Sequence, residues 1–395
     1  MDLTLPPVPR VRTAHRSPLQ SLLHDYLFRI LLLLLAGLSL ADPARIRTYP
    51  GLVDWPTMAT LTGLLMLTKG VELSGFLRHA GALLLTRMKS ERSLALLLVC
   101  ATGLLATLLT NDVALFVVVP LTLTLGRQPA AAASERQTNR EGGLPILRLI
   151  IFEALAANAG STLTPIGNPQ NLYLWQQSHG SFVAFCTAML PLALLLLGTL
   201  LLMTACLFSG RANPPAPSHE EGAVDRPMLL GCLALYLPFL VLTDLHHAPA
   251  ALVAVLVIFM VLYRRVLMQV DWPLLLVFML MFIDLRLVAA AAPVRALVAG
   301  IDLAQAPHLY LSAIAASQVI SNVPATILLA QYTQDWRTLA YGVNVGGAGL
   351  AIGSLANIIA LRMAPQRRAW LVFHGYAIPY LLVTAALTHA WLTLR

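Results

Sequence analysis

Two polar segments that break helical periodicity interrupt apolar runs, and their side chains are suited to holding a small solute. The first reads Asn-Ala-Gly-Ser-Thr-Leu-Thr-Pro-Ile-Gly-Asn-Pro-Gln-Asn over 158–171. Two glycines and two prolines in so short a span cannot form a continuous helix. An unwound stretch at membrane depth is tolerated only where protein buries it or where it lines a cavity. Its free carbonyls can bind a cation, and the start of the next half-helix can bind an anion. The sequence therefore predicts that the segment 158–171 binds a small solute.

A second segment, 344–357, repeats this pattern at a constant shift of 186 residues. Asn158, Gly160, Gly167 and Asn171 correspond to Asn344, Gly346, Gly353 and Asn357. Small residues of this kind either allow two helices to cross closely or line a binding site. The matched pair of copies favours the binding site.

Two further apolar stretches, 93–126 and 308–332, are each interrupted near the middle by polar residues. The interruptions are Thr110-Asn111-Asp112 and Ser321-Asn322. They are either the tips of re-entrant hairpins or turns between ordinary spans, and we favour hairpins. The hydroxyls and amides could also act as plain helix caps. With the broken segments, the tips give these predicted substrate-binding residues: Thr110, Asn111, Ser321, Asn322, Thr164, Pro165, Gly167, Asn168, Asn171, Gly353, Ser354 and Asn357.

Asp112 places a carboxylate at the expected depth of the membrane. Such a charge is costly there unless it is paired, ion-bound or protonated. We therefore expect Asp112, with Asn158 and Asn344, to form the site of a coupling ion, either H+ or Na+. No other cofactor and no metal site is expected.

The composition indicates which elements must position these residues. The chain is 58% hydrophobic and 11% charged with a mean hydropathy of +0.76, whereas soluble domains carry about 25% charged residues. The sequence thus predicts an all-α polytopic membrane protein with about nine full spans and two hairpins. The expected spans are 22–41, 56–76, 146–176, 182–208, 228–243, 250–263, 272–290, 338–361 and 369–393. The four cysteines are expected to be small buried hydrophobes.

A repeated tetrapeptide supports an internal duplication. Val-Asp-Trp-Pro occurs at 53–56 and again at 270–273, and each aspartate is expected to cap the helix that follows. Fifteen residues beyond the two aspartates lie Lys69 and Arg286. These two cations either attract an anion or pair locally with Glu72 and Asp284, and we favour local pairing.

The distribution of basic residues predicts the orientation. With the amino terminus in the cytoplasm, eighteen of the 26 basic residues fall in cytoplasmic segments and five outside, which places the carboxyl terminus outside. An odd number of crossings separates the copies, so the repeats are predicted to be inverted. The expected divisions are a cytoplasmic tail 1–21, repeat 1 at 22–208, a linker with a connecting helix at 209–248, and repeat 2 at 249–395.

These motifs resemble the ion transporter superfamily, which includes divalent anion–sodium symporters, CitM-type citrate transporters and ArsB-type arsenite pumps. The runs at 67–75, 109–116 and 317–324 resemble the YbiR type of inner-membrane transporter nearly word for word. The resemblance covers about residues 20–393. It implies two hairpins, two broken helices and a substrate site between them, often worked by an elevator-type movement. The anion–sodium symporters have Ser-Asn-Thr at both tips, whereas this chain has Asp112 and Val323 in the third position.

We therefore expect a secondary transporter for a small anion or weak acid in the cell inner membrane, coupled to protons or sodium. The alternatives are efflux of an arsenite-type oxyanion, cation/proton antiport and, less favoured, a channel. No nucleophile with its base and no phosphate-binding loop is present, so an enzyme or nucleotide motor is not expected. The expected partners are a small-molecule or ion substrate and the lipid bilayer. Nucleic acid is excluded because the basic residues lie in short loops, and a homodimer remains open.

Overall fold

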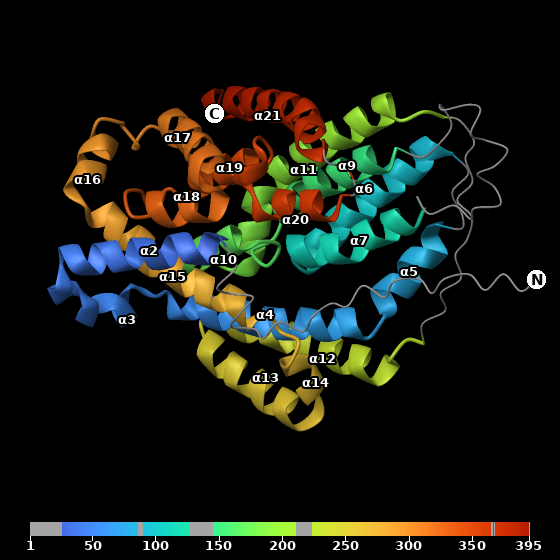
Figure 1. Ribbon diagram of the computed structural model, residues 1–395, viewed down its shortest axis with the longest axis horizontal. Coiled ribbons are helices and arrows are strands. Elements are labelled where there is room, and N and C mark those ends of the chain that lie inside the picture. The colour runs from blue at the N-terminus through green and yellow to red at the C-terminus, as the bar shows by residue number, and fades with distance from the viewer. Residues whose placement is uncertain are drawn as a thin grey trace, which may run out of the picture.

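All elements in the described part of the chain are helices, as the sequence predicts. The computed structural model describes residues 26–85, 90–125, 145–210, 223–364, 366 and 368–394. The expected tail 1–21, residues 211–222 of the linker and the final Arg395 lie outside these ranges. Figure 1 shows the helices running mostly along the long axis of the molecule.

The repeated tetrapeptide starts two equivalent helices, α4 (Trp55–Leu73) and α15 (Trp272–Ala290). Asp54 Oδ1 accepts the Thr57 N–H at 3.0 Å, and Asp271 Oδ1 accepts the Leu274 N–H at 3.0 Å. Each helix has proline in its first turn, where a missing N–H costs nothing. Both predicted caps are confirmed.

Several helices surround α4 and α15 and form one side of the molecule. α2 packs on α15, while α12 and α13 pack on α4. After α2 the chain bends by 119° into the segment Pro43–Leu52. The bounds are α2 (Tyr26–Ala41), η1 (Pro43–Thr48), α3 (Tyr49–Leu52), α5 (Phe76–Leu85), α12 (Arg226–Asp244), α13 (Ala248–Leu262), α14 (Arg264–Leu267) and α16 (Ala292–Ala299). We call α2, α3, α4, α12, α13 and α15 the scaffold group.

Two helical hairpins lie on the other side of this group. α6 (Glu91–Leu108) returns through a two-residue turn into α7 (Asn111–Leu125), and α17 (Ala306–Ile320) returns through Ser321 into α18 (Asn322–Leu329). The arms of each hairpin pack on one another. Figure 1 shows the two hairpins in opposite halves of the molecule.

Each predicted broken segment separates two half-helices. α9 (Ile146–Ser161) is followed by α10 (Pro169–Ser178), and α19 (Trp336–Gly346) is followed, after the short η2 (Ala351–Gly353), by α20 (Leu355–Met363). The half-helices α9 and α19 form the core, because every residue of 149–161 and of 338–346 is buried. The apolar stretches 146–176 and 338–361 are therefore broken at the glycines, prolines and asparagines of 158–171 and 344–357, as the sequence predicts.

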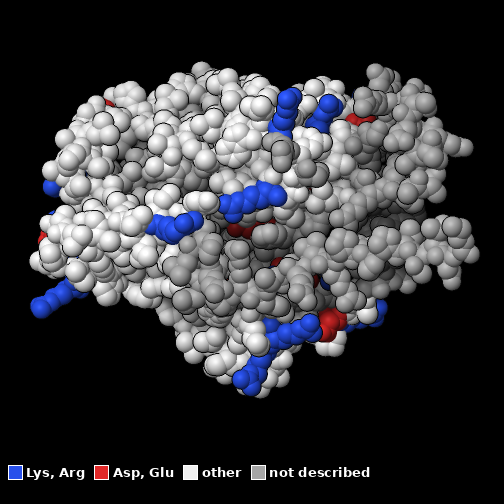
Figure 2. All heavy atoms as spheres, viewed as in Figure 1, with Lys and Arg blue, Asp and Glu red and all other residues white. Residues whose placement is uncertain are grey.

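Apolar side chains cover much of the outer surface. α11 (Phe182–Leu207) and α21 (Ala369–Thr393) expose leucines such as Leu202 and Leu371, at 67% and 70%. Figure 2 shows few charged side chains on the face in view. Five helices in the described ranges are long and apolar enough to cross a membrane, or six if the bent pair counts as one span; the five are α6, α11, α12, α15 and α21.

The expectation for the cysteines was wrong in three of four cases. Only Cys232 is buried, Cys186 is partly exposed, and Cys100 and Cys206 are exposed. Apolar residues need not be buried in protein where the surrounding solvent is hydrocarbon.

Candidate functional site

Asn158, near the end of α9, connects the first broken segment to the second. Its Nδ2 donates to Asn357 Oδ1 at 2.8 Å and to the carbonyl of Ala154 at 3.3 Å. Its Oδ1 accepts the Ser354 hydroxyl at 2.8 Å. One amide thereby holds the start of α20 against the end of α9.

Asn344, its counterpart near the end of α19, makes the reciprocal contacts. Its Nδ2 donates to Asn171 Oδ1 at 2.7 Å and to the carbonyl of Ala340 at 2.8 Å. Its Oδ1 accepts from Asn168 Nδ2 at 3.1 Å. Each of these three partners lies 186 residues from the corresponding partner of Asn158. The two halves of the chain therefore exchange equivalent hydrogen bonds.

The amides that begin the second half-helices fasten the broken loops. Asn171 Nδ2 donates to the carbonyl of Ser161 at 3.2 Å, and Asn357 Nδ2 donates to the carbonyl of Gly347 at 2.8 Å. Ser161 and Gly347 are again 186 residues apart. All five asparagines named so far are at most 5% exposed, so they have exchanged water for protein partners. We call this set the asparagine network; its members are Asn158, Asn168, Asn171, Asn344, Ser354 and Asn357.

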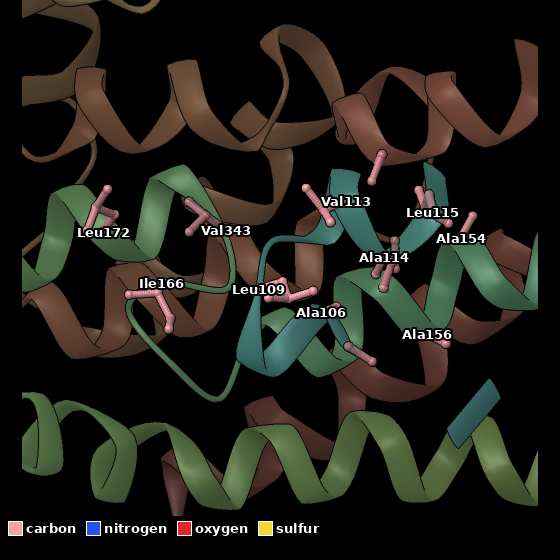
Figure 3. Close-up of a cluster of buried hydrophobic side chains, with 14 of the residues drawn as sticks. Ala106, Leu109, Val113, Ala114, Leu115, Ala154, Ala156, Ile166, Leu172 and Val343 are labelled. Atoms are coloured by element: carbon pink, nitrogen blue, oxygen red, sulfur yellow. The ribbon is translucent and has the colours of Figure 1, made fainter. Parts of the chain in front are cut away.

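The first hairpin tip lies against the first broken loop. The N–H of Asn111 donates to the carbonyl of Gly167 at 2.9 Å, while Thr110 Oγ1 accepts the Val113 N–H at 3.3 Å. Thr164 donates to the carbonyl of Thr107 at 2.7 Å, and the neighbouring Pro165 is buried. Figure 3 shows apolar residues such as Leu109, Val113 and Ile166 beside this tip and loop.

The second hairpin tip lies against the second broken loop with fewer hydrogen bonds. Ser321 Oγ reaches the carbonyl of Gly353 at 3.5 Å, and Ser321 has a φ of 75°, a conformation that serine rarely adopts. Asn322 is 3% exposed, and its side chain forms no hydrogen bond with the described residues. A Cβ at Gly347 would lie 3.0 Å from Asn322 Nδ2. The structure therefore brings both tips to the broken loops, as the sequence predicts.

The electrostatics of this region come from helix starts. α7, α10, α18 and α20 all begin beside the asparagine network, and their N-termini carry partial positive charge. Asn168 caps α10 by accepting the Asn171 N–H at 2.9 Å, whereas α18 and α20 have no side-chain cap. Asp112 is half-buried in the first turn of α7, and its carboxylate forms no ion pair with the described residues. The region offers N–H groups, amides and hydroxyls, with one carboxylate and no predicted cationic residue.

Neither of the two matched cations forms a hydrogen bond with a member of the network in the described part of the chain. Lys69 pairs with Glu72 at 2.9 Å, which confirms the prediction of local pairing. Arg286 does not pair with Asp284; it contacts Asp54 at 3.5 Å and donates to the carbonyl of Leu52 at 2.9 Å. The local prediction fails for Arg286 because residues two apart project to different sides of a helix.

The prediction missed a second matched pair of polar side chains. Thr107 donates to the carbonyl of Gly160 at 2.8 Å, and Gln318 donates to the carbonyl of Gly346 at 2.5 Å. Thr107 and Gln318 are 211 residues apart, the same separation as Asn111 and Asn322. Applying this shift along the hairpins would have identified both residues.

The family model described as citrate transporter matches residues 27–335. The chain belongs to this family. It is a multi-pass membrane transporter, and the half-helices α9 and α19 occupy its interior. It is 46% identical to inner membrane protein YbiR of Escherichia coli over 376 residues, 95% of this chain and 98% of that protein.

Two further relatives are more distant. An uncharacterized transporter of Methanocaldococcus jannaschii is 31% identical over 317 residues, which cover 79% of this chain and 82% of the relative. A silicon efflux transporter of rice is 32% identical over 176 residues, 45% of this chain and 34% of the relative.

Proposed function

We propose that this member of the citrate transporter family is a secondary active transporter that moves a small anion or weak acid across the inner membrane. The asparagine network is the single observation that carries the proposal. It joins two broken helices at a point where two hairpin tips also arrive, so four half-helix starts face one region. Discontinuous helices of this kind supply substrate and ion sites in secondary transporters.

The reciprocal hydrogen bonds support two structural repeats related by an approximate two-fold axis. Exchanging the two halves converts the bonds of Asn158 into those of Asn344. Together with the hairpins in opposite halves of the molecule (Figure 1), this supports inverted repeats over 22–208 and 249–395. Alternating access would then move the site relative to the scaffold group.

The donor set supports a small oxygen-rich solute of low charge. The uncapped starts of α18 and α20 offer N–H groups to a carboxylate or hydroxyl oxygen, and the predicted substrate-binding residues include no lysine, arginine or histidine. Asp112 opposes a multiply charged anion unless it holds H+ or Na+. We therefore favour a weak acid or a monoanion, with Asp112, Asn158 and Asn344 as the residues that bind the coupling ion.

Efflux of a neutral oxyacid is the second candidate. It is favoured by the similarity to the rice silicon efflux transporter and by the uncharged predicted lining, since silicic and arsenous acids are neutral at physiological pH. Amides and hydroxyls can satisfy such solutes without a fixed cation.

Flux into proteoliposomes tests both candidates. The purified chain would be offered citrate, succinate, phosphate, silicic acid and arsenite under an imposed sodium or proton gradient. We expect saturable flux of one class that depends on one of the two gradients. Exchange of cations for protons without flux of any of these solutes would overturn the proposal, and single-channel conductance would indicate a channel instead.

The orientation is proposed from the basic residues, with the amino terminus in the cytoplasm and the carboxyl terminus outside. Alkaline phosphatase fused after Arg395 should be active in intact cells, because the enzyme matures only outside the cytoplasm. The assignment would be reversed if the phosphatase fusion were inactive and a green fluorescent protein fused at the same end were fluorescent.

A further inference from the structure

Glu153 is a carboxyl group enclosed in the core of the molecule. It lies in α9, seven residues after the helix begins, and has no exposed surface. Thr122 of α7 donates its hydroxyl to Glu153 Oε1, and Oε2 is buried without a hydrogen-bond partner among the described residues. An ionised carboxylate in this position would have lost its water without gaining a compensating charge.

The helices packed around α9 bring no cation to Glu153. α9 packs against α6, α7, α11, α20 and α21. Their described charged and titratable side chains, with those of α9 itself, are Glu91, Arg92, Cys100, Asp112, Arg148, Cys186, Cys206, Arg362, His374, Tyr376, Tyr380 and His389. Within the described ranges none of these forms an ion pair or hydrogen bond with Glu153. The nearest cation along α9, Arg148, donates instead to the carbonyl of Leu207 at 2.8 Å.

The matched position in the other half shows that packing does not require a carboxyl here. The shift of 186 that relates Asn158 to Asn344 places Leu339 opposite Glu153. Leu339 is 0% exposed, as Glu153 is. Because the duplicated helix accepts leucine in the same interior position, the glutamate serves a purpose other than filling space.

The helix α7, which covers Glu153, contains a proline close to Thr122. Pro120 lies inside α7, two residues before Thr122. Proline removes one backbone hydrogen bond and lets a helix bend at the preceding turn. A bend of α7 at this point would separate Thr122 from Glu153 and admit water from the end of the hairpin that the charge distribution assigns to the cytoplasm.

We propose that Glu153 is a proton-binding site of the transport cycle, neutral while Thr122 covers it and exchanging its proton with the cytoplasm when α7 bends away. This inference rests on the proposed function and selects the proton as a coupling ion. A metal cation is a poor fit, because Na+ or a divalent ion needs several oxygen ligands, and the only hydrogen-bond partner of the Glu153 carboxyl in the described ranges is the Thr122 hydroxyl.

Infrared spectroscopy of the full-length protein in lipid tests the protonation state without any substrate. The spectrum of Glu153→Gln would be subtracted from that of the wild type over a pH series. We expect a carbonyl band of a protonated carboxylic acid in the difference spectrum at neutral pH. Carboxylate bands in its place would show that Glu153 is ionised. This result would overturn the inference about Glu153 but would not contradict the proposed transport function.

Flux measurements with a trapped pH indicator test the role of the proton. The probes are citrate, silicic acid and arsenite, and the variants are Glu153→Gln, Glu153→Asp and Glu153→Leu. We expect Glu153→Gln and Glu153→Leu to retain exchange of the transported probe but to lose its accumulation under a pH gradient. Glu153→Asp should retain part of this accumulation. The matched control is Asp302→Asn, the same loss of a carboxyl in an exposed loop, which should keep the wild-type response.

The outcomes separate the two proposals. Proton-driven accumulation by Glu153→Gln at the wild-type level would overturn the assignment of Glu153, because Gln can still accept the Thr122 hydroxyl and would satisfy a purely structural role. If the wild type moves none of the probes, the proposed function fails, and the infrared difference spectrum still decides whether Glu153 carries a proton.

Discussion

At the scale of single residues, the asparagine network fixes the broken helices through side chains that we also propose to be part of the binding site. Asn158 uses both atoms of its amide, donating to Asn357 and accepting from Ser354. Buried amides of this kind contribute little net stability when satisfied and cost much more when a partner is lost. The network therefore holds the broken helices in one register and leaves little tolerance for substitution.

Removing the Asn158 amide should destabilise the protein and stop transport. Asn158→Ala leaves Asn357 Oδ1 and the Ser354 hydroxyl without their partner, at a cost of about 1–3 kcal/mol for such groups. Thermal unfolding in detergent and flux into proteoliposomes measure the two effects. Asn357→Ala and the double variant complete a cycle, in which we expect a coupling energy of about 0.5–3 kcal/mol. Additive effects of the two substitutions would contradict the hydrogen bond.

Asp112 should affect ion dependence more than folding. Its carboxylate has no ion-pair partner in the described ranges, so Asp112→Asn removes charge without orphaning another group. We expect flux of the transported solute to persist at a reduced rate and to lose its dependence on the driving ion. Flux at several sodium concentrations and pH values would measure this, with Asp302→Asn in an exposed loop as a control outside the predicted site. Full, ion-dependent uptake by Asp112→Asn would remove Asp112 from the coupling site.

The sequence could predict these residues but not their partners. Equal spacing in two copies identified Asn158, Asn344 and Asn357, because duplication preserves what both copies need. It could not show that Asn158 contacts Asn357 rather than Asn171, since a pairing between repeats depends on how the halves are placed in space. The sequence analysis did not single out Glu153, because its copy is a leucine and Thr122 lies in another helix.

At the scale of elements, glycines set how closely the hairpins approach the broken helices. A Cβ on Gly160 of α9 would collide with the carbonyl oxygen and Cα of Gly103 in α6. These atoms belong to the backbone, so no side-chain movement can relieve the contact. The same approach recurs in the second half, where a Cβ on Gly346 would lie 3.1 Å from Ile314 Cα. Hairpin and broken helix therefore form one packed unit in each half.

A methyl group at Gly160 should separate α6 from α9. We expect Gly160→Ala to lower stability by about 1–3 kcal/mol, the usual cost of overpacking, and to reduce transport because the hairpin tip leaves the loop at Gly167. Gly198→Ala in α11 is the control, since nothing lies within 4 Å of its added Cβ and alanine favours helix by up to about 1 kcal/mol. Thermal unfolding of the two variants would be compared. Equal unfolding temperatures would contradict the close packing.

The sequence predicted those features of the elements that depend only on neighbouring residues. The caps at Asp54 and Asp271 and the breaks at 158–171 and 344–357 follow from neighbouring residues, and the structure shows them. The bend after α2 was not predicted, because the expected span ends at residue 41 and no helix was expected in the charged residues that follow, which include Asp42, Arg45 and Arg47. The contact of Arg286 with Asp54 also joins distant parts of the chain, and no local pattern indicates it.

At the scale of the whole molecule, the hydrogen bonds between α10 and the scaffold group are few and lie close together. Gln176 Nε2 donates to Thr60 Oγ1 at 3.2 Å, and Gln177 Nε2 donates to Asp54 Oδ2 at 2.7 Å. By contrast, the asparagine network joins the broken helices to one another, and the contacts of Asn111 with Gly167 and of Ser321 with Gly353 join the hairpin tips to them. A body with dense internal contacts and a sparsely bonded boundary can slide as a unit. The proposed moving part therefore comprises α6, α7, α9, α10 and α17–α20.

Crosslinking across this boundary should stop transport reversibly. Thr60→Cys and Gln176→Cys would be introduced after the four native cysteines are replaced by alanine, and the pair joined by a reducible bifunctional thiol reagent. We expect flux to cease after crosslinking and to return on reduction, because α10 must move past α4 for the site to change sides. The controls are the single variants Thr60→Cys and Gln176→Cys in the same cysteine-free background, which should keep their flux after the same treatment because one thiol cannot bridge α4 and α10. Undiminished flux in fully crosslinked protein would show that α10 and α4 stay together throughout the cycle, and would locate the moving boundary elsewhere.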